Sequence, residues 1–370
     1  MRTHLAAVAA AAALGGAAAG YLIAPTPGDA AARAARDQAA SYPAGGTRTS
    51  PGADEPGAND EPPNTGRQPP DTGGQPSETG GQPSDTDPRA SNAKPRTPKT
   101  MHIALNMPAG DRTRAAALGY DLFDAAPDAG DLAALPPGGR ALLWVGNTTC
   151  GEFAIASTRE FTATVRRFAR DPRVYGWYLS DEPNPADCPG IAARIRKRAD
   201  IVHRHAPGQK AFASLTDWPM RALRPDVTHL DLIGLDPYPC RTDRACDLDD
   251  IDRMVRQADR AGFPRRMIVP VFQTFGQECN SGARQWRLPR AGELRAMLRR
   301  WDRFVRDPAF DISYSWGRQR RWACPTLADA DGDDGLPDLQ SVMRRHNTRP
   351  AAARTSAPSP APTGPCVDED

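Results

Sequence analysis

Short apolar segments alternate with amphipathic segments along the middle of this chain, and this alternation restricts its fold more than any other feature. The apolar segments are residues 102–107, 120–124, 141–146, 174–179, 210–215, 230–235, 267–272 and 311–316. Alternating strands and helices predict a parallel sheet, and eight such units in about 250 residues match a closed (β/α)8 barrel, the TIM-barrel fold. We therefore predict a single α/β barrel domain over residues 101–349.

Amphipathic patterns between these strands predict the helices of the barrel. They cover residues 112–118, 128–135, 158–170, 186–205, 219–223, 248–261, 290–305 and 336–345. An open, doubly wound sheet is the alternative, but no Gly-x-Gly-x-x-Gly follows the first strand and no phosphate-binding loop occurs. We expect no cofactor. Pro270 removes a hydrogen-bond donor inside the seventh strand, so we expect a bulge there.

The flanks of the predicted domain differ from it in composition. Residues 1–24 carry Arg2 and His4 before a long alanine-rich apolar run, which predicts either a cleaved export signal, the reading we favour, or an N-terminal membrane anchor. Residues 25–100 are rich in Pro, Gly, Ser, Thr and Asp and predict a disordered linker. Residues 350–370 predict a disordered tail.

Six of the seven cysteines lie inside the predicted domain, each just after a strand or in the loop that follows one. An even number of cysteines behind an export signal predicts disulfides and a secreted or extracellular protein. The favoured pairs join neighbouring or identical loops: Cys150 with Cys188, Cys240 with Cys246, and Cys279 with Cys324. Cys366 in the tail is left over.

The charge pattern gives no sign of nucleic-acid binding. The formal net charge is +2, and most arginines fall on the predicted helices, where a solvated face is the simplest explanation. No basic patch is interleaved with aromatic residues, so we exclude nucleic acid as a leading partner. We expect a monomer.

The fourth predicted strand ends in an unusual way. Residues 176–183 read Gly-Trp-Tyr-Leu-Ser-Asp-Glu-Pro, an aromatic strand that runs directly into Asp181 and Glu182. Carboxylates at the end of a buried strand cost desolvation energy, so they are kept where ligands or chemistry need them. In a (β/α)8 barrel, catalytic groups lie at the C-terminal ends of the strands. Asp181 and Glu182 would lie at that rim.

Further polar and aromatic residues fall at the other predicted strand ends. Aromatic faces stack on sugar rings, while carboxylates and amides hydrogen-bond to hydroxyl groups, so this set favours a carbohydrate ligand. Any one tryptophan or tyrosine of the set is equally well explained as part of the core. Besides the carboxylates, the candidate sugar-binding residues are Asn106, Trp144, Trp218, Tyr238, Gln273, Tyr314 and Trp316.

The sequence from Gly176 to Pro183 resembles the fourth-strand motif of the large clan of (β/α)8 retaining glycoside hydrolases, in which the acid/base glutamate precedes a proline. The resemblance extends to Leu-Asp-Pro-Tyr-Pro at 235–239 and Tyr-Ser-Trp at 314–316, and it spans residues 101 to about 345. It implies that Glu182 is the general acid/base and that an aromatic residue of the last strand forms the floor of a sugar subsite.

The chain departs from that clan at two positions. Asp181 replaces the asparagine that precedes the acid/base glutamate, and Gln273 stands where the clan has its nucleophilic glutamate. Hydrolysis therefore needs another carboxylate, about 5–5.5 Å from the acid for retention or about 6.5–9.5 Å for inversion. Asp236 is the first candidate, unless it serves only a turn before Pro237. Asp181 is second, because adjacent side chains of a regular strand point to opposite faces, and Glu278 is third.

Other chemistries lack their motifs or have weaker ones. No His-Glu-x-x-His or Gly-x-Ser-x-Gly occurs, and no Cys-x-x-Cys supports a zinc site. The acidic run 329–335 is similar to a calcium loop but departs from the EF-hand pattern, so it is either a calcium site or a solvated loop. We predict an exported glycoside-hydrolase-like protein; the alternative is a catalytically inactive barrel that binds polysaccharide.

Overall fold

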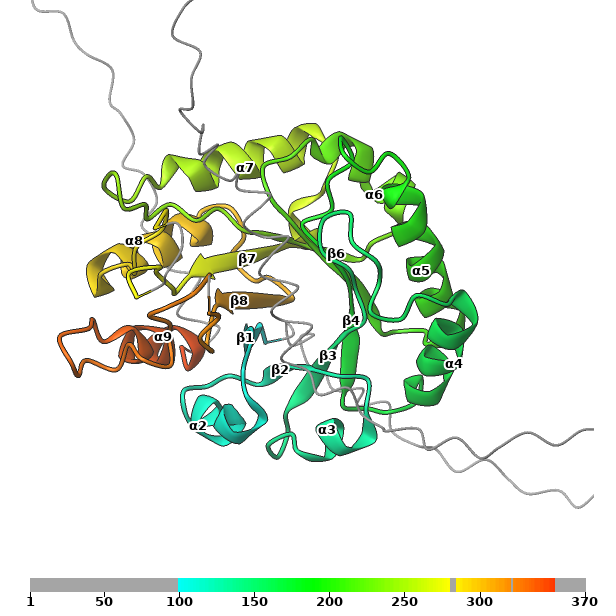
Figure 1. Cartoon of the computed structure of the whole chain (residues 1–370), viewed down its shortest axis with the longest axis horizontal. Coiled ribbons are helices and arrows are strands. Elements are labelled where there is room, and N and C mark those ends of the chain that lie inside the picture. Colours follow the sequence, from blue (N-terminus) through cyan, green and yellow to red (C-terminus); the bar gives the residue numbers. More distant parts are fainter. Residues whose placement is uncertain (1–98, 280–283, 321, 350–370) are drawn as a thin grey trace, which may run out of the picture. The chain divides into compact units, whose positions relative to one another are not determined.

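The computed structural model describes residues 99–279, 284–320 and 322–349, which form a closed barrel of eight parallel strands with consecutive strands paired in order. Figure 1 shows the strands at the centre and the helices around them. The strands are β1 (Met101–Ala104), β2 (Leu122–Ala125), β3 (Arg140–Trp144), β4 (Val174–Asp181), β5 (Lys210–Leu215), β6 (Leu232–Leu235), β7 (Ile268–Gln273) and β8 (Phe310–Tyr314). The predicted TIM-barrel fold is confirmed.

The helices follow the strands as the alternation predicts. They are α2 (Arg112–Ala117), α3 (Ala129–Ala133), α4 (Thr158–Phe168), α5 (Ile191–His205), α6 (Pro225–Thr228), α7 (Asp249–Arg260), α8 (Ala291–Asp302) and α9 (Leu339–Asn347). Residues 219–223 form a 3-10 turn, Met220–Leu223, instead of an α-helix. Helix α5 begins five residues later than predicted, because Cys188 is bound to Cys150 and Pro189 and Gly190 follow it.

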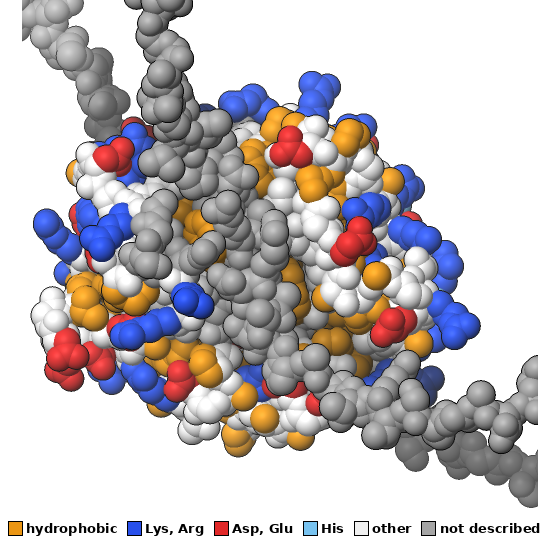
Figure 2. All heavy atoms as spheres, viewed as in Figure 1, with side chains coloured by type: hydrophobic (Ala, Val, Ile, Leu, Met, Phe, Trp, Pro, Cys, Tyr) orange, Lys and Arg blue, Asp and Glu red, His pale blue; other side chains and the backbone are white. Residues whose placement is uncertain are grey.

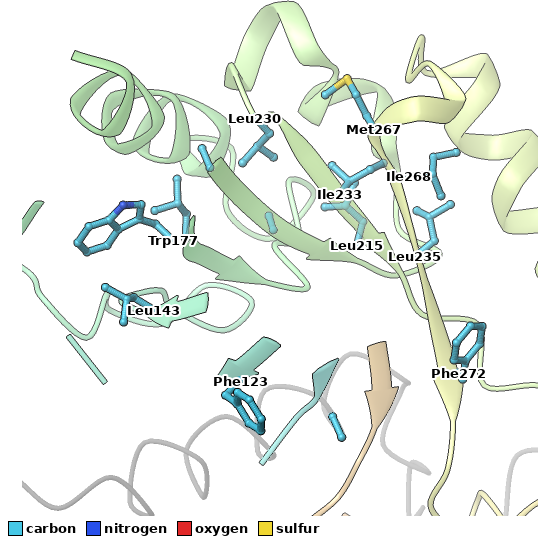
Figure 3. Packing of buried hydrophobic residues seen from close by; sticks show 14 of the residues in the cluster. Phe123, Leu143, Trp177, Leu215, Leu230, Ile233, Leu235, Met267, Ile268 and Phe272 are labelled. Carbon is cyan, nitrogen blue, oxygen red and sulfur yellow. The ribbon is translucent and has the colours of Figure 1, made fainter. Parts of the chain in front are cut away.

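Two layers of apolar side chains hold the barrel together. The outer layer lies between the strands and the helices, and Figure 3 shows part of it, with Leu215, Ile233 and Ile268 coming from three neighbouring strands. The inner layer fills the barrel and includes Phe212 and Phe310, whose rings meet edge to face at 5.2 Å. Packed side chains close the interior, so a ligand can enter only at an end of the barrel.

The register of the sheet shifts in β4 and not in β7. Pro270 pairs with Leu235 without a register shift, so the bulge predicted there is wrong. Instead, the pairing of β4 with β5 shifts between Tyr178 and Ser180. A bulge adds one residue and reverses the alternation of side chains beyond it. This shift changes the direction of the residues that end β4.

The three predicted disulfides are confirmed: Cys150–Cys188, Cys240–Cys246 and Cys279–Cys324. All six cysteines lie in loops that leave the C-terminal ends of the strands, so the bridges brace the face where the loops gather. Disulfides persist in oxidising surroundings, which favours an extracellular protein.

Several predictions fall on residues outside the described ranges: the export signal or anchor over 1–24, almost all of the linker over 25–100, and the tail with Cys366. Among the residues that are described, no helix is long and apolar enough to cross a membrane. Figure 2 shows lysine and arginine side chains spread around the margin of the face it views.

Candidate active site

A cavity opens among the loops at the C-terminal ends of the strands, and it is open to solvent at its mouth. Three carboxyl groups line it, those of Asp181, Glu182 and Asp236. Six aromatic side chains form most of its wall: Tyr178, Tyr238, Phe275, Trp286, Tyr314 and Trp322.

The end of β4 turns two adjacent carboxyl groups toward this one cavity. On a regular strand Asp181 and Glu182 would face opposite sides. The register shift after Tyr178 changes that direction, and Glu182 then adopts a left-handed backbone conformation with φ of 44°. Its N–H donates to the carbonyl of Ser214 at 2.9 Å, which holds the chain in place. A left-handed conformation is uncommon for glutamate, costs about 1–3 kcal/mol and tends to occur at functional sites.

Glu182 and Asp236 form a hydrogen-bonded pair of carboxyl groups, and the pKa of each is raised. Both side chains are more than nine-tenths buried. Burial raises the pKa of Glu182 well above its usual range, and the nearby charges of Asp236 and Asp181 raise it further. Burial also raises the pKa of Asp236, although the hydrogen bond from Glu182 acts in the opposite direction.

One oxygen of each member of this pair has no hydrogen-bond partner among the described residues. These atoms are Oε2 of Glu182 and Oδ1 of Asp236. A buried polar atom without a partner costs about 1–3 kcal/mol, so its presence in a cavity indicates a place for a ligand or a water molecule.

Asp181 is held by a side chain from its own strand. The hydroxyl group of Tyr178 donates to Oδ1 of Asp181 at 2.6 Å. Burial raises the pKa of Asp181 to about 6, while the hydrogen bond from Tyr178 lowers it. The charges of Asp236 and Asp181 raise the pKa of Glu182 further, so Asp181 is ionised more easily than Glu182 near neutral pH.

Four residues of the aromatic wall come from the loops that carry the disulfides, and Tyr178 and Tyr314 come from strands β4 and β8. The rings of Tyr238 and Tyr314 stack at 5.6 Å, and the ring of Phe275 is nearly perpendicular to both, at 5.0 and 5.2 Å. Trp286 packs 5.8 Å from Tyr238. The hydroxyl group of Tyr314 donates to Gln319 at 2.6 Å, which fixes the direction of its ring.

The structure therefore brings together five of the residues chosen from the sequence: Asp181, Glu182, Asp236, Tyr238 and Tyr314. Asp236 also accepts a hydrogen bond from the hydroxyl group of Ser214 at 3.3 Å. Ser214 lines the same cavity, so Asp236 faces the ligand space and does more than close a turn.

Gln273, at the end of β7, does not line the cavity. It is fully buried, and its amide bonds to the backbone of the loops that follow β6 and β7. Oε1 accepts from the N–H of Cys240 at 2.8 Å, while Nε2 donates to the carbonyls of Cys240 and Arg287, both at 3.0 Å. Gln273 therefore holds these loops together, and its side-chain amide is hydrogen-bonded to their backbone.

Four other predicted sugar contacts also lie outside the cavity lining. Trp316 is fully buried and donates to Asp111 at 2.9 Å. Trp144 packs inside the barrel, 4.7 Å from the ring of Tyr178. Trp218 lies partly exposed after β5, and Asn106 lies after β1 with its side-chain amide buried and without a partner among the described residues.

Glu278 and Asp329 have structural partners. Oε1 of Glu278 accepts from the N–H of Leu288 at 2.7 Å, and this residue does not line the cavity. In the acidic run 329–335, Asp329 pairs with Arg318 at 2.7 Å and accepts from the N–H of Thr326 at 2.9 Å. Neither arrangement supports the role considered from the sequence.

Two groups of side chains in the described part of the chain have metal-ligating atoms close together. Cys240, Cys246 and Glu293 form one, but its cysteines are joined in a disulfide. The other is near the beginnings of β1 and β8, where both oxygens of Asp311 are hydrogen-bonded, to His102 Nδ1 at 2.8 Å and to His346 Nε2 at 2.8 Å. Its contacts are those of a hydrogen-bonded triad.

Sequence reasoning missed four aromatic cavity residues: Tyr178, Phe275, Trp286 and Trp322. Tyr178 stands three residues before Asp181, and a regular strand would have turned the two apart. Trp286 and Trp322 lie in the loops after the seventh and eighth strands, near Cys279 and Cys324. Their closeness in sequence to these cysteines is the feature that could have identified them as cavity residues.

No protein-family model matches the sequence, and no curated protein matches it. Solved structures similar to the barrel include a β-galactosidase from Marinomonas ef1, with a TM-score of 0.48 and 11% identity over 67% of this chain and 59% of that one. A GH18 chitinase, ChiB, from Flavobacterium johnsoniae has a TM-score of 0.44 and 10% identity over 68% of this chain and 95% of that one.

A β-glucuronidase from Ruminococcus gnavus has a TM-score of 0.44 and 11% identity, over 67% of this chain and 50% of its own. The chain thus spans 59% of the β-galactosidase and half of the β-glucuronidase. The strand pairing of the described domain, and not these likenesses, shows that it is a TIM barrel.

Proposed function

We propose that this protein is an exported glycoside hydrolase in which Glu182 is the general acid. The observation that carries the proposal is the setting of Glu182: a buried carboxyl group with a raised pKa at a strand end, hydrogen-bonded to Asp236, with its other oxygen unpartnered beside an aromatic cavity. A carboxylic acid kept protonated near neutral pH is the group that glycosidic-bond cleavage requires.

In this mechanism Glu182 protonates the oxygen of the departing sugar. Asp236 accepts the hydrogen bond of Glu182, raises its pKa and holds its side chain in one direction. Proton transfer from a positioned acid contributes about 10²–10⁴ in rate. The carboxyl groups are in direct hydrogen-bond contact, closer than the about 5–5.5 Å that separates acid and nucleophile in retaining enzymes. We therefore assign Asp236 a positioning role.

Asp181 is the carboxylate available to the reacting sugar. The hydroxyl group of Tyr178 holds it, and part of its surface is open to solvent. As the bond breaks, positive charge develops on the sugar ring, and an ionised carboxylate nearby stabilises that charge until water adds to the anomeric carbon and gives its proton to Glu182. Tyr238 and Tyr314 offer ring faces against which a sugar can stack.

Export is the second part of the proposal. The apolar run over residues 1–24 supports it, and so does the occurrence of three disulfides in one domain.

A barrel that binds glycans without cleaving them is the second candidate. Two observations favour it: β7 ends in Gln273, whose amide is bound to the backbone, and Glu278 is engaged with the N–H of Leu288. No carboxylate from the described part of this loop reaches the cavity.

Hydrolysis of a panel of aryl glycosides and polysaccharides tests the proposal. The full chain, Glu182→Gln and Glu278→Gln would be compared; both variants make the same chemical change, but only Glu182 lines the cavity. We expect Glu182→Gln to lose turnover by about 10³, and Glu278→Gln to retain it. Binding of glycans without turnover in all three proteins would favour the second candidate.

A further inference from the structure

The charge of the cavity restricts the kind of sugar that it can hold. Asp181, Glu182 and Asp236 line it, and no Lys, Arg or His does so among the described residues. Three carboxyl groups that share protons still leave net negative charge near neutral pH, and the lining supplies no cation to balance it. Burying such charge is unfavourable unless a ligand provides the opposite charge.

The aromatic side chains of the cavity also favour a positively charged ligand. The face of an aromatic ring is electron-rich, and it attracts an ammonium group within about 6 Å of the ring centre. Tyr238, Tyr314 and Phe275 pack against one another on one side of the cavity, and Trp286 extends that wall. An ammonium group would meet ring faces and carboxylates together, whereas a carboxylate-bearing sugar would be repelled by both.

The nearest arginines belong to an adjoining cavity. Arg241, Arg244 and Arg253 line that second space, which shares Asp236, Tyr238 and Trp286 with the first. Arg241 and Arg253 are paired with aspartates, Asp243 at 3.5 Å and Asp250 at 2.6 Å. Two of these three charges are therefore already balanced, and none is in the lining of the first cavity.

The unpartnered oxygens point to the atoms that a ligand would supply. Oε2 of Glu182 and Oδ1 of Asp236 are acceptors on side chains more than nine-tenths buried. An ammonium group carries three N–H donors and no acceptor, so it can satisfy such oxygens. A hydroxyl group offers one donor, and an N-acetyl group offers one N–H together with a bulky carbonyl.

From the cage of three carboxyl groups and aromatic rings, we propose that this cavity selects an amino sugar with a free, protonated amino group, as found in de-N-acetylated glycans. The inference rests on the proposed glycan function and names its substrate class. Selection is expected against both the N-acetylated form of the same sugar and sugars that carry a carboxylate.

Binding tests this without depending on turnover. The full-chain Glu182→Gln variant, which should not cleave, would be titrated at pH 6.5 with four tetrasaccharides: glucosamine, N-acetylglucosamine, glucose and a uronic acid. Tryptophan fluorescence is a direct readout, since Trp286 and Trp322 line the cavity. Calorimetry on the wild-type protein with the same ligands would check that the substitution has not created the preference.

We expect the glucosamine oligomer to bind at least tenfold more tightly than the other three. Asp181→Asn should reduce that preference about tenfold, and Asp226→Asn should leave it unchanged, because Asp226 is an exposed residue of α6 with the same charge. If Asp181→Asn does not fold, the relative affinities of the four ligands for the wild-type protein still show whether the cavity prefers an amino sugar.

Equal affinities, or tighter binding of the neutral, acetylated or acidic oligomer, would overturn the selection for an amine while leaving the glycan function standing. Absence of binding to every oligosaccharide, together with absence of turnover on the glycoside panel, would overturn the proposed function itself.

Discussion

Asp311 and Glu182 are both buried carboxyl groups of the same barrel, yet their surroundings shift their pKa values in opposite directions. Burial alone would raise the pKa of Asp311, but His102 and His346 outweigh it and hold that pKa far below its usual range. At Glu182, burial and two neighbouring carboxyl groups all raise the pKa. Burial is shared, so the partners account for the difference.

Their positions in the barrel match this difference. Asp311 lies near the beginning of β8 and ties β1 to α9 through two histidines, with both oxygens bonded. Glu182 follows the end of β4 and keeps one oxygen unpartnered. In such barrels the N-terminal end serves stability and the C-terminal end serves catalysis. A fully bonded carboxylate is typical of a structural site, and an incompletely bonded one indicates a ligand site.

The largest expected effect on this comparison comes from substituting Glu182. Glu182→Gln should lower turnover by about 10³ and leave the fold at least as stable, because it removes a buried group that resists ionisation. Turnover and thermal unfolding would be measured on the same preparation. A large loss of stability with modest loss of turnover would mean that Glu182 is structural and the comparison is broken.

Asp311→Asn should have the opposite outcome. Removing one partner of a buried charged group costs about 3–5 kcal/mol, so denaturant unfolding should show a loss of that order. Asp200→Asn is the matched control, since Asp200 also bonds a histidine, His229 at 2.7 Å, but is well exposed. The free energy of unfolding of Asp200→Asn should fall by less than about 1 kcal/mol. Equal losses in the two variants would show that burial of the triad is unimportant.

Asp236→Asn tests whether Asp236 raises the pKa of Glu182. The charge of Asp236 raises the pKa of Glu182, so removing that charge lowers it. In the proposed mechanism Glu182 acts as an acid, so activity falls as pH rises through its pKa, and this alkaline limb should move to lower pH in the variant. We expect turnover to fall by roughly ten- to a hundredfold. An unmoved limb in the pH–rate profile would contradict the positioning role.

The smallest effect is the pH dependence of stability. The pKa of Asp311 is lowered on folding, so its stabilisation is present above about pH 4 and is lost as pH falls through the folded-state pKa. The pKa of Glu182 is raised, so its contribution is present below about pH 4 and is lost as pH rises through the folded-state pKa.

The gain in melting temperature of Glu182→Gln over wild type should therefore grow from pH 5 to pH 8. The loss in Asp311→Asn should instead shrink below pH 4. Calorimetry across this range measures both, and parallel pH profiles for the two variants would refute the assignment of opposite roles.

Much of the fold was predictable because its signals are local. Eight apolar segments and the helices between them follow from periodicity, and the disulfides follow from cysteines placed in neighbouring loops. Helix starts were less predictable. The segment 186–190 has a helical pattern, but the bridge at Cys188 and the following Pro189 delay the helix to Ile191.

The site was predictable in part. Glu182, Asp236 and Tyr314 follow from their places at strand ends. Gln273 and Trp316 have the same kind of position but point into backbone hydrogen bonds and the outer core. A residue at a strand end can face either way, and the sequence carries no record of which neighbours will occupy its hydrogen-bonding groups.

By itself, the sequence determined a parallel barrel, the placement of Asp181 and Glu182 at its rim, and the position of six cysteines in loops on one face, because periodicity and spacing are local properties. The tertiary structure alone decided that a register shift and a left-handed Glu182 turn both carboxyl groups into one cavity. It also decided that Asp236 contacts Glu182 and that Asp311 is enclosed by His102 and His346. These facts set the pKa values, and they depend on contacts between residues distant in the chain.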